Sequence, residues 1–320
     1  MRTALVLTLL LAATCRGDQV WLGDSLARLG FPNPDPVREG RESFERKAYP
    51  RVILAERDRE YVTIEGIKVF LEDGIRASTY RVRGRPDTVR LTIDRSDYLA
   101  AVSPILWGPP PGARRPLRIV LDPGHGGRDP GKQNAQLKVD EKTMTLDVAK
   151  RLATLLRQTG HEVLLTREND TFVELKERPA FANRAKADLF VSIHFNADKS
   201  AQANGTETFC LTPAGQHSTN DPANRGSTAA EPGNRQDALN ILLAFEVQRQ
   251  LVGSLGGADR GVRRARWAVL TDLNCPGILV EAAFLSNPEE ARKVATEAFR
   301  QSIAQNLAAA IAGYEARLAR

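Results

Sequence analysis

Three apolar runs in the last two thirds of the chain have the length and the β-branched content of buried strands. They span residues 117–121, 189–194 and 278–284. A further strand is predicted at 161–166, after a helix whose apolar positions from Val148 to Leu156 repeat at i, i+3 and i+4. Because strands alternate with helices, the pattern predicts an α/β fold over residues 117–320, a three-layer domain with a mainly parallel sheet flanked by helices.

The preceding third of the chain has a different pattern, made of short alternating strands. They are predicted at 52–54, 61–64, 67–71, 79–82 and 89–93. Glu65-Gly66 is typical of a tight hairpin turn between two of them. We therefore expect a small, mostly β N-terminal module at 51–106, preceded by a lead-in segment at 18–50. A linker at 107–116 follows, in which three consecutive prolines favour an extended conformation.

The first residues carry the pattern of a secretory signal peptide. Arg2 is followed by an apolar run from residue 4 to 13, which is too short to span a bilayer. We expect residues 1–17 to be removed and the protein to be exported to the periplasm or the cell envelope. Lipid anchoring at Cys15 is the less favoured alternative. No other segment is apolar enough to be a membrane span.

Composition adds little beyond a globular class. The chain is 42% hydrophobic and 26% charged, and its formal charge of +6 suits weak attraction to an anionic polymer such as cell-wall material. No basic patch with interleaved aromatic residues indicates binding of nucleic acid. Three cysteines exclude a disulfide scaffold. Cys210 and Cys275 could form one bridge, but two buried free thiols are the favoured expectation.

The first candidate for chemistry is His125, in a glycine-rich loop directly after the strand at 117–121. The carboxyl end of a buried strand is where α/β sheets present functional groups. A structural histidine is the commoner explanation for such a residue. A phosphate-binding loop is disfavoured because Gly131-Lys132 is followed by Gln133, where magnesium binding needs serine or threonine.

Three further residues complete a pattern around His125. Glu141 opens the amphipathic helix, His194 ends the second apolar strand, and Glu281 lies inside the third. Two histidines and a glutamate form the ligand set of a catalytic zinc with one open position. A carboxylate in a core strand is costly unless it is paired or acts on water. Glu141 alone would be explained by the helix dipole, so its role depends on the other ligands.

At these residues the sequence resembles the zinc-dependent N-acetylmuramoyl-L-alanine amidases of the type 3 family. The matching segments lie in order across residues 117–320, about two thirds of the chain, at 122–131, 141–142, 165–167, 192–197 and 280–287. Ala283 stands where the family pattern usually has glycine. Arg167 and Arg178 also match the pattern, as residues that either neutralise carboxylates or position substrate.

The resemblance implies a substrate and a mechanism that spacing alone does not. It implies Zn²⁺ held by His125, Glu141 and His194, with Glu281 as the general base. It also implies hydrolysis of the amide bond between N-acetylmuramic acid and L-alanine in peptidoglycan. The residues by themselves indicate only a metal hydrolase. An activator protein is a possible partner.

Two other function classes stay open at this point. One is an inactive peptidoglycan-binding protein that keeps the fold, and the other is a zinc peptidase of other specificity. The N-terminal module distantly resembles copper-amine-oxidase-like N-terminal domains, but residues 51–107 contain no histidine or cysteine, so no copper is implied. We expect it to dock to wall polymer or a partner, or to act as a spacer.

The two remaining histidines are not favoured as ligands. His161 stands at the beginning of a predicted strand and is expected at the surface. His217 lies in a long polar loop at 212–235, which we expect to border the substrate, to act as a lid or simply to be mobile.

Overall fold

The structure of the protein is a computed structural model of the full chain. It describes residues 15–16, 19–21, 41–46, 49–56, 59–80, 88–107, 116–220 and 226–319. The chain divides into two compact units, Met1–Trp107 and Gly108–Arg320. Most of the expected signal peptide (1–17), lead-in segment (18–50) and linker (107–116) lies outside the described residues, so those predictions are not tested.

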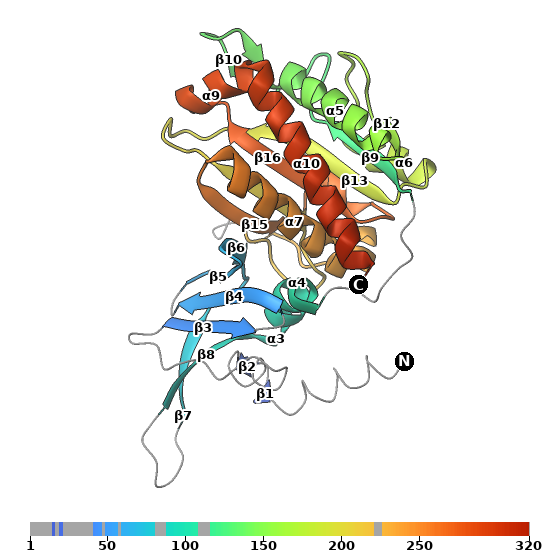
Figure 1. The fold of residues 1–320 in the computed structure, drawn as a ribbon. Coiled ribbons are helices and arrows are strands. Elements are labelled where there is room, and N and C mark those ends of the chain that lie inside the picture. Colours follow the sequence, from blue (N-terminus) through green and yellow to red (C-terminus); the bar gives the residue numbers. More distant parts are fainter. Residues whose placement is uncertain are drawn as a thin grey trace. The chain divides into compact units, whose positions relative to one another are not determined.

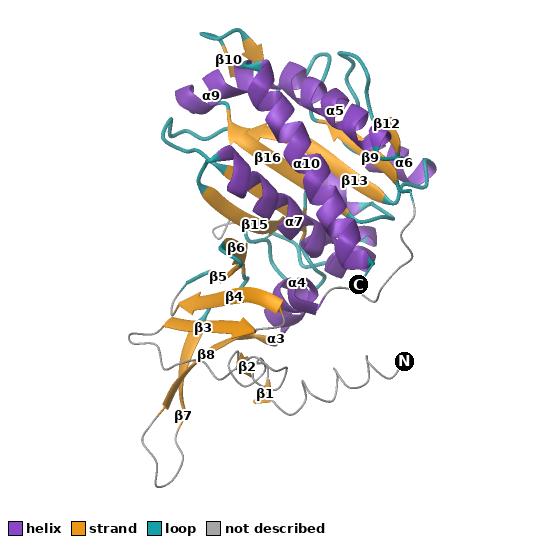
Figure 2. Cartoon of the chain, in the orientation of Figure 1, coloured by secondary structure: helices purple, strands orange, loops and turns teal. Residues whose placement is uncertain are grey.

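The first unit contains antiparallel strands followed by a short helical segment (Figures 1 and 2). Its strands are β1 (Cys15–Arg16), β2 (Gln19–Trp21), β3 (Arg41–Arg46), β4 (Tyr49–Glu56), β5 (Tyr61–Ile64), β6 (Ile67–Phe70), β7 (Arg76–Tyr80) and β8 (Thr88–Asp94). One group pairs in the order β1-β2-β8-β7, and β3 to β6 pair consecutively. The sequence pattern predicted that the module begins at residue 51, but strand pairing in this unit starts upstream of that residue.

The hairpin at Glu65-Gly66 forms as predicted. Ile64 pairs with Ile67, and both turn residues have positive φ, 50° and 84°, as a two-residue turn requires. The helical end of this unit has no counterpart in the sequence prediction. It consists of α3 (Arg95–Asp97), the π-helical turn η1 (Tyr98–Val102) and α4 (Ser103–Trp107), and it begins where the Asp94 side chain accepts the backbone N–H of Ser96.

The second unit alternates strands and helices. Its strands are β9 (Arg118–Pro123), β10 (Gln133–Asn134), β11 (Val139–Asp140), β12 (Glu162–Leu165), β13 (Leu189–Asn196), β14 (Thr206–Leu211), β15 (Asp259–Ala265) and β16 (Gly277–Phe284). Its helices are α5 (Glu141–Gln158), α6 (Glu177–Arg184), the 3₁₀ turn η2 (Pro232–Gln236), α7 (Asp237–Leu255), α8 (Ala268–Thr271), α9 (Pro288–Ala295) and α10 (Glu297–Leu318).

The main sheet of this unit has the order β12-β9-β13-β16-β14-β15. Every neighbouring pair is parallel except β14 with β16, which is antiparallel. Helices α5, α7 and α10 pack together over one face of the sheet (Figure 1), and α6 and α8 contribute to the core on the other face. The α/β fold with a mainly parallel sheet flanked by helices is confirmed. None of the described helices combines the length and apolar composition needed to cross a bilayer.

Strand β15 is absent from the sequence prediction because its residues are not apolar. It reads Asp-Arg-Gly-Val-Arg-Arg-Ala, yet it pairs in parallel with β14. Arg264 is fully buried, and its Nη1 donates to Oε1 of Gln216 at 2.5 Å. A buried arginine that donates to a polar side chain can thus occupy a strand position that a hydrophobicity pattern reserves for aliphatic residues.

The structure shows the environment of two cysteines and one histidine whose burial the sequence did not determine. Cys210 and Cys275 are both buried free thiols, which was the favoured expectation. His161 does not lie at the surface as predicted, because only 8% of its side chain is exposed. Its Nδ1 accepts the backbone N–H of Leu117, and its Nε2 lies 3.5 Å from Oε2 of Glu315.

One face of the sheet changes character along the strands. Near the start of the strands, residues such as Phe190 and Leu279 belong to an apolar cluster with side chains of α6 and α8. Alternate residues share a face, so Ser192 and His194 follow Phe190, and Glu281 follows Leu279. The polar residues therefore gather on this face toward the carboxyl ends of the parallel strands.

A buried ion pair stabilises this polar region. Nη1 of Arg178 on α6 lies 2.8 Å from Oδ1 of Asp122 on β9, and both side chains are almost fully buried. The hydroxyls of Thr166 and Ser192 donate to the same carboxylate at 2.6 and 2.7 Å. Because both oxygens of Asp122 have partners, the charge is tolerated inside the fold.

Replacing Arg178 tests this pair. We expect Arg178→Met to lower the free energy of unfolding by about 3–5 kcal/mol, because it leaves the Asp122 carboxylate buried without its cation. Arg184→Met is the matched control on the same helix, since Arg184 makes only an exposed ion pair with Glu177. Its expected cost is below about 1 kcal/mol. Equal losses for the two variants in chemical denaturation would contradict this account.

Candidate metal centre

His125 is presented by a tight loop that leaves the end of β9. The loop closes through two hydrogen bonds between the backbones of Gly126 and Asp129, at 2.9 and 3.1 Å. His125 itself has a left-handed φ of 61°, which is uncommon for a residue other than glycine and points to a locally imposed conformation. The strain is consistent with a functional position, because such residues persist only where the surroundings enforce them.

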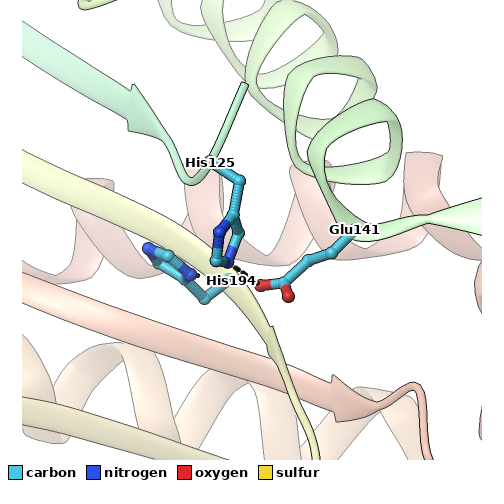
Figure 3. Close-up of side chains that lie close together, drawn as sticks. All are labelled: His125, Glu141 and His194. Atoms are coloured by element: carbon cyan, nitrogen blue, oxygen red, sulfur yellow. Dashed lines mark hydrogen bonds and ion pairs between the residues drawn. The ribbon is translucent and has the colours of Figure 1, made fainter. Parts of the chain in front are cut away.

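Three sequence-predicted residues meet at this edge of the sheet, as Figure 3 shows. Nε2 of His125 lies 3.0 Å from Oε1 of Glu141, and Nδ1 of His194 lies 3.1 Å from the same oxygen. One potential ligand atom from each side chain falls within 4.8 Å of the other two. The two imidazole rings meet edge to face, with centroids 4.9 Å apart. This cluster of His125, Glu141 and His194 could hold one metal ion.

Glu141 is held by backbone donors as well as by the histidines. It is the first residue of α5; its Oε1 accepts the N–H of Phe195 at 3.0 Å, and its Oε2 accepts that of Lys132 at 2.8 Å. Burial alone would raise the pKa of its carboxyl, but the hydrogen bonds and charges of the two histidines outweigh burial and lower that pKa far below its usual range. Glu141 is thus an anionic ligand group.

Asp129 orients the ring of His125. Its Oδ2 lies 2.8 Å from Nδ1 of His125, and its Oδ1 accepts the backbone N–H of Gly131 at 3.0 Å. A carboxylate can only accept there, so Nδ1 carries a proton, and loss of the proton from Nε2 would free the lone pair of Nε2 for a metal. Burial lowers the pKa of His125, but bonds to and charges of Glu141 and Asp129 outweigh it and raise that pKa.

Arg167 and Arg178 contact the backbone of the loop rather than open solvent. Arg167 donates to the carbonyl oxygens of Pro123, Gly124 and Lys142, at 3.0, 2.8 and 2.7 Å. Arg178 donates to the carbonyl of His125 at 3.0 Å, in addition to its bond with Asp122. Of the two roles left open by the sequence, the contacts support a structural one for both side chains.

A second segment closes over the glycine loop from outside. Oδ1 of Asp170 accepts the N–H of Gly127 at 2.7 Å, and its Oδ2 lies 2.7 Å from Nζ of Lys142, the residue after Glu141. The same Nζ donates to the carbonyl of Gly127 at 2.9 Å. This bridge links the segment that carries His125 to the helix that carries Glu141.

Glu281 lies beside the cluster but is not part of it. It is in register with His194 on one side and with Glu207 on the other. Its Oε2 is buried and makes no hydrogen bond within the part of the chain that the structure describes. Burial, followed by the negative charges of Glu141 and Glu207, raises the pKa of its carboxyl well above the usual range. Such a group is suited to exchanging protons.

Sequence reasoning did not identify the residues that support the ligands. Asp129 and Asp170 carry no periodic signal, since their partners are backbone groups and residues from other segments. The loop at 212–235 follows β14, which runs antiparallel to β16. This loop therefore starts at the opposite end of the strands from the candidate metal centre, which does not favour the prediction that it borders the substrate. His217 is not among the described groups that could hold a metal.

Together, the fold and this cluster define an α/β protein with a candidate mononuclear metal centre at the carboxyl ends of its parallel strands. The chain belongs to the N-acetylmuramoyl-L-alanine amidase family, whose model matches residues 119–313. The matched range contains all four residues singled out from the sequence.

One curated relative is N-acetylmuramoyl-L-alanine amidase AmiC of Escherichia coli O6:H1, which is 35% identical over 246 residues, 69% of this chain and 59% of that protein. The chain spans about half the length of the curated relatives it matches, with shares of 59%, 33% and 55%.

Solved structures agree with the fold. The catalytic domain of CwlV, an N-acetylmuramoyl-L-alanine amidase from Bacillus (Paenibacillus) polymyxa, is 32% identical with a TM-score of 0.52, covering 62% of this chain and 97% of that one. The CwlD amidase of Clostridioides difficile, in complex with the GerS lipoprotein, is 26% identical with a TM-score of 0.50, covering 62% and 98%.

Gly124 offers a test of the cluster's geometry. A Cβ atom there would lie 2.6 Å from Nδ1 of His194, so the imidazole of His194 must move in the Gly124→Ala variant. We expect this variant to bind Zn²⁺ at least about tenfold more weakly, as measured by competition with a chromophoric chelator. Gly253→Ala, where a Cβ would meet nothing within 4 Å, is the control. Unchanged affinity in a folded Gly124→Ala protein would contradict His194 as a ligand.

Proposed function

We propose that this protein hydrolyses the amide bond between N-acetylmuramic acid and L-alanine in peptidoglycan, using Zn²⁺ at the His125, Glu141 and His194 cluster and Glu281 as general base. The observation that carries the proposal is the convergence of these three potential ligands, at the strand ends, in a chain that belongs to the amidase family. The proposed catalytic domain spans residues 117–320.

The donor set fits a zinc ion. Two neutral imidazoles and one carboxylate are the ligands of several catalytic zinc sites, and they leave a position open. Gly131 keeps the site clear, because a Cβ there would come within 2.6 Å of both Glu141 Oε2 and His125 Cδ2. When bound, such an ion polarises the scissile carbonyl and makes water more acidic.

Glu281 supplies the proton transfers. Its unpartnered Oε2 accepts a proton from the attacking water, and the carboxyl then donates this proton to the departing nitrogen of L-alanine. The C–N bond breaks, leaving a carboxylate on the lactyl group and a free amino terminus on the peptide. Burial, followed by the charges of Glu141 and Glu207, raises the pKa of this carboxyl, which strengthens it as a proton acceptor.

The proposed function also suggests where the enzyme acts and which partners it has. We propose that residues 1–17 direct export, so that the enzyme acts in the periplasm or the cell envelope. One structural neighbour was solved in complex with a lipoprotein, which supports an activator as a partner here. We propose that the N-terminal module docks to wall polymer or to such a partner.

The experiment is digestion of whole peptidoglycan by the full chain, with and without a chelator, followed by mass spectrometry. We expect stem peptides with a free alanine amino terminus, lost on chelation and restored by Zn²⁺. Cleavage inside the peptide would instead identify a peptidase. Zinc binding without release of peptide, even with candidate activators, would identify a binding protein.

Glu281→Gln separates metal binding from proton transfer. We expect zinc affinity to stay within about twofold and peptide release to fall by about 10²–10⁴-fold, the usual contribution of a general base. Glu289→Gln, an exposed carboxylate at the start of α9, should leave turnover unchanged. Substantial residual turnover in Glu281→Gln would reject its role as the base.

A further inference from the structure

A row of charged side chains continues from the candidate metal centre toward the edge of the sheet. His194 on β13 is in register with Glu281 on β16, and Glu281 is in register with Glu207 on β14. Directly opposite residues on neighbouring strands share a face, so these three side chains lie side by side. Beyond Glu207 comes β15, whose Arg260 has its Nε 3.7 Å from Oε2 of Glu207.

The negative charge of Glu207 is already compensated without Arg260. Nε of Arg263 lies closer to the same oxygen, at 3.2 Å, and the side-chain amide of Asn196 donates to Oε1. Arg263 is also anchored, because its Nη1 donates to the carbonyl of Thr219 at 3.0 Å. The single carboxylate of Glu207 is therefore close to two guanidinium groups, those of Arg260 and Arg263.

The other carboxylate near Arg260 is also occupied. The charge of Arg260 reaches Glu290, but the two oxygens of Glu290 accept the backbone N–H groups of Gly205 and Phe284, at 3.0 and 2.7 Å. Glu290 therefore interacts with Arg260 only at a distance.

Arg260 itself lacks the hydrogen bonds that a half-buried guanidinium usually makes. Its Nε is buried without a hydrogen-bond partner among the described residues, and its guanidinium carbon stacks 4.7 Å from the centre of the Phe284 ring. About a third of the side chain, 32%, is still exposed. A planar cation fixed on an aromatic ring, with donors to spare, is a suitable receptor for a carboxylate.

The separation between Glu281 and Arg260 matches the distance between the scissile bond and a carboxylate of the proposed substrate. Arg260 lies two strands away from Glu281, and two strand spacings make roughly 10 Å. In peptidoglycan the residue after L-alanine is a D-glutamate joined through its side chain, so its α-carboxylate is free. From the scissile carbonyl to that carboxylate, two extended residues span roughly 7 Å, and an arginine–carboxylate hydrogen bond adds about 3 Å.

We infer that Arg260 determines substrate specificity by binding the free carboxylate of the second residue of the stem peptide, an inference that rests on the proposed function. Arg263 and Asn196 hold Glu207, which in turn keeps Arg260 beside Phe284. The carboxylate receives hydrogen bonds from the outer nitrogens of the guanidinium. The leaving peptide is thereby aligned along the row from Glu281 to Arg260.

The experiment compares two small substrates with the zinc-loaded full chain. One is N-acetylmuramoyl-L-alanyl-D-glutamate, and the other carries an α-carboxamide in place of the α-carboxylate. We expect kcat/KM to be about ten- to a hundredfold higher for the acid, the range given by a hydrogen bond to a charged group. Arg260→Gln should lower cleavage of the acid to the level of the amide, and change cleavage of the amide by less than about twofold.

Two further variants complete the design. Arg260→Lys, which keeps the charge but loses the planar fork, should retain part of the preference. Arg292→Gln removes an exposed arginine of α9 and should keep the full preference. A wild-type protein that cleaves acid and amide equally, or an Arg260→Gln protein that loses both activities together, would overturn the inference and leave the proposed function standing. Cleavage of neither substrate, together with no release of stem peptides from whole peptidoglycan, would overturn both.

Discussion

The carboxylate of Glu141 is the interaction on which the candidate metal centre depends. It is buried, and it accepts from two backbone N–H groups while facing the rings of His125 and His194. A buried anion is costly unless every oxygen has donors or cations around it. The loop after β9, the start of α5 and the end of β13 must therefore come together for the carboxylate to be tolerated at all.

The supporting contacts are arranged so that this convergence does not rest on the three ligands alone. Arg167 and Arg178 bind the carbonyl oxygens of the loop from the protein interior, and Asp170 with Lys142 closes it from the outside. Asp129 fixes the ring of His125. Because each of these groups is itself held by further partners, the positions of the ligands are set before any ion binds, which is the usual design of a precise metal site.

The same sheet face that carries the cluster also carries a row of further charged side chains. Its apolar part packs against α6 and α8, and its polar part lies toward the carboxyl ends of the parallel strands. The antiparallel strand β14 brings Glu207 into this row, and β15 adds two arginines to it. Strand direction thus decides which charges stand next to Glu281 and which loops lie at the far edge.

The sequence by itself determined the α/β class, the hairpin at Glu65-Gly66 and the three residues that meet in the candidate metal centre, because hydrophobic periodicity and strand-end motifs are local signals. It did not reveal β15, whose buried Arg264 donates to Gln216 in another segment, nor the burial of the His161 side chain. The contacts of Asp129, Asp170 and Arg260 depend on the tertiary structure alone. Their partners lie on other segments or on the backbone, and only folding brings those groups within hydrogen-bonding distance.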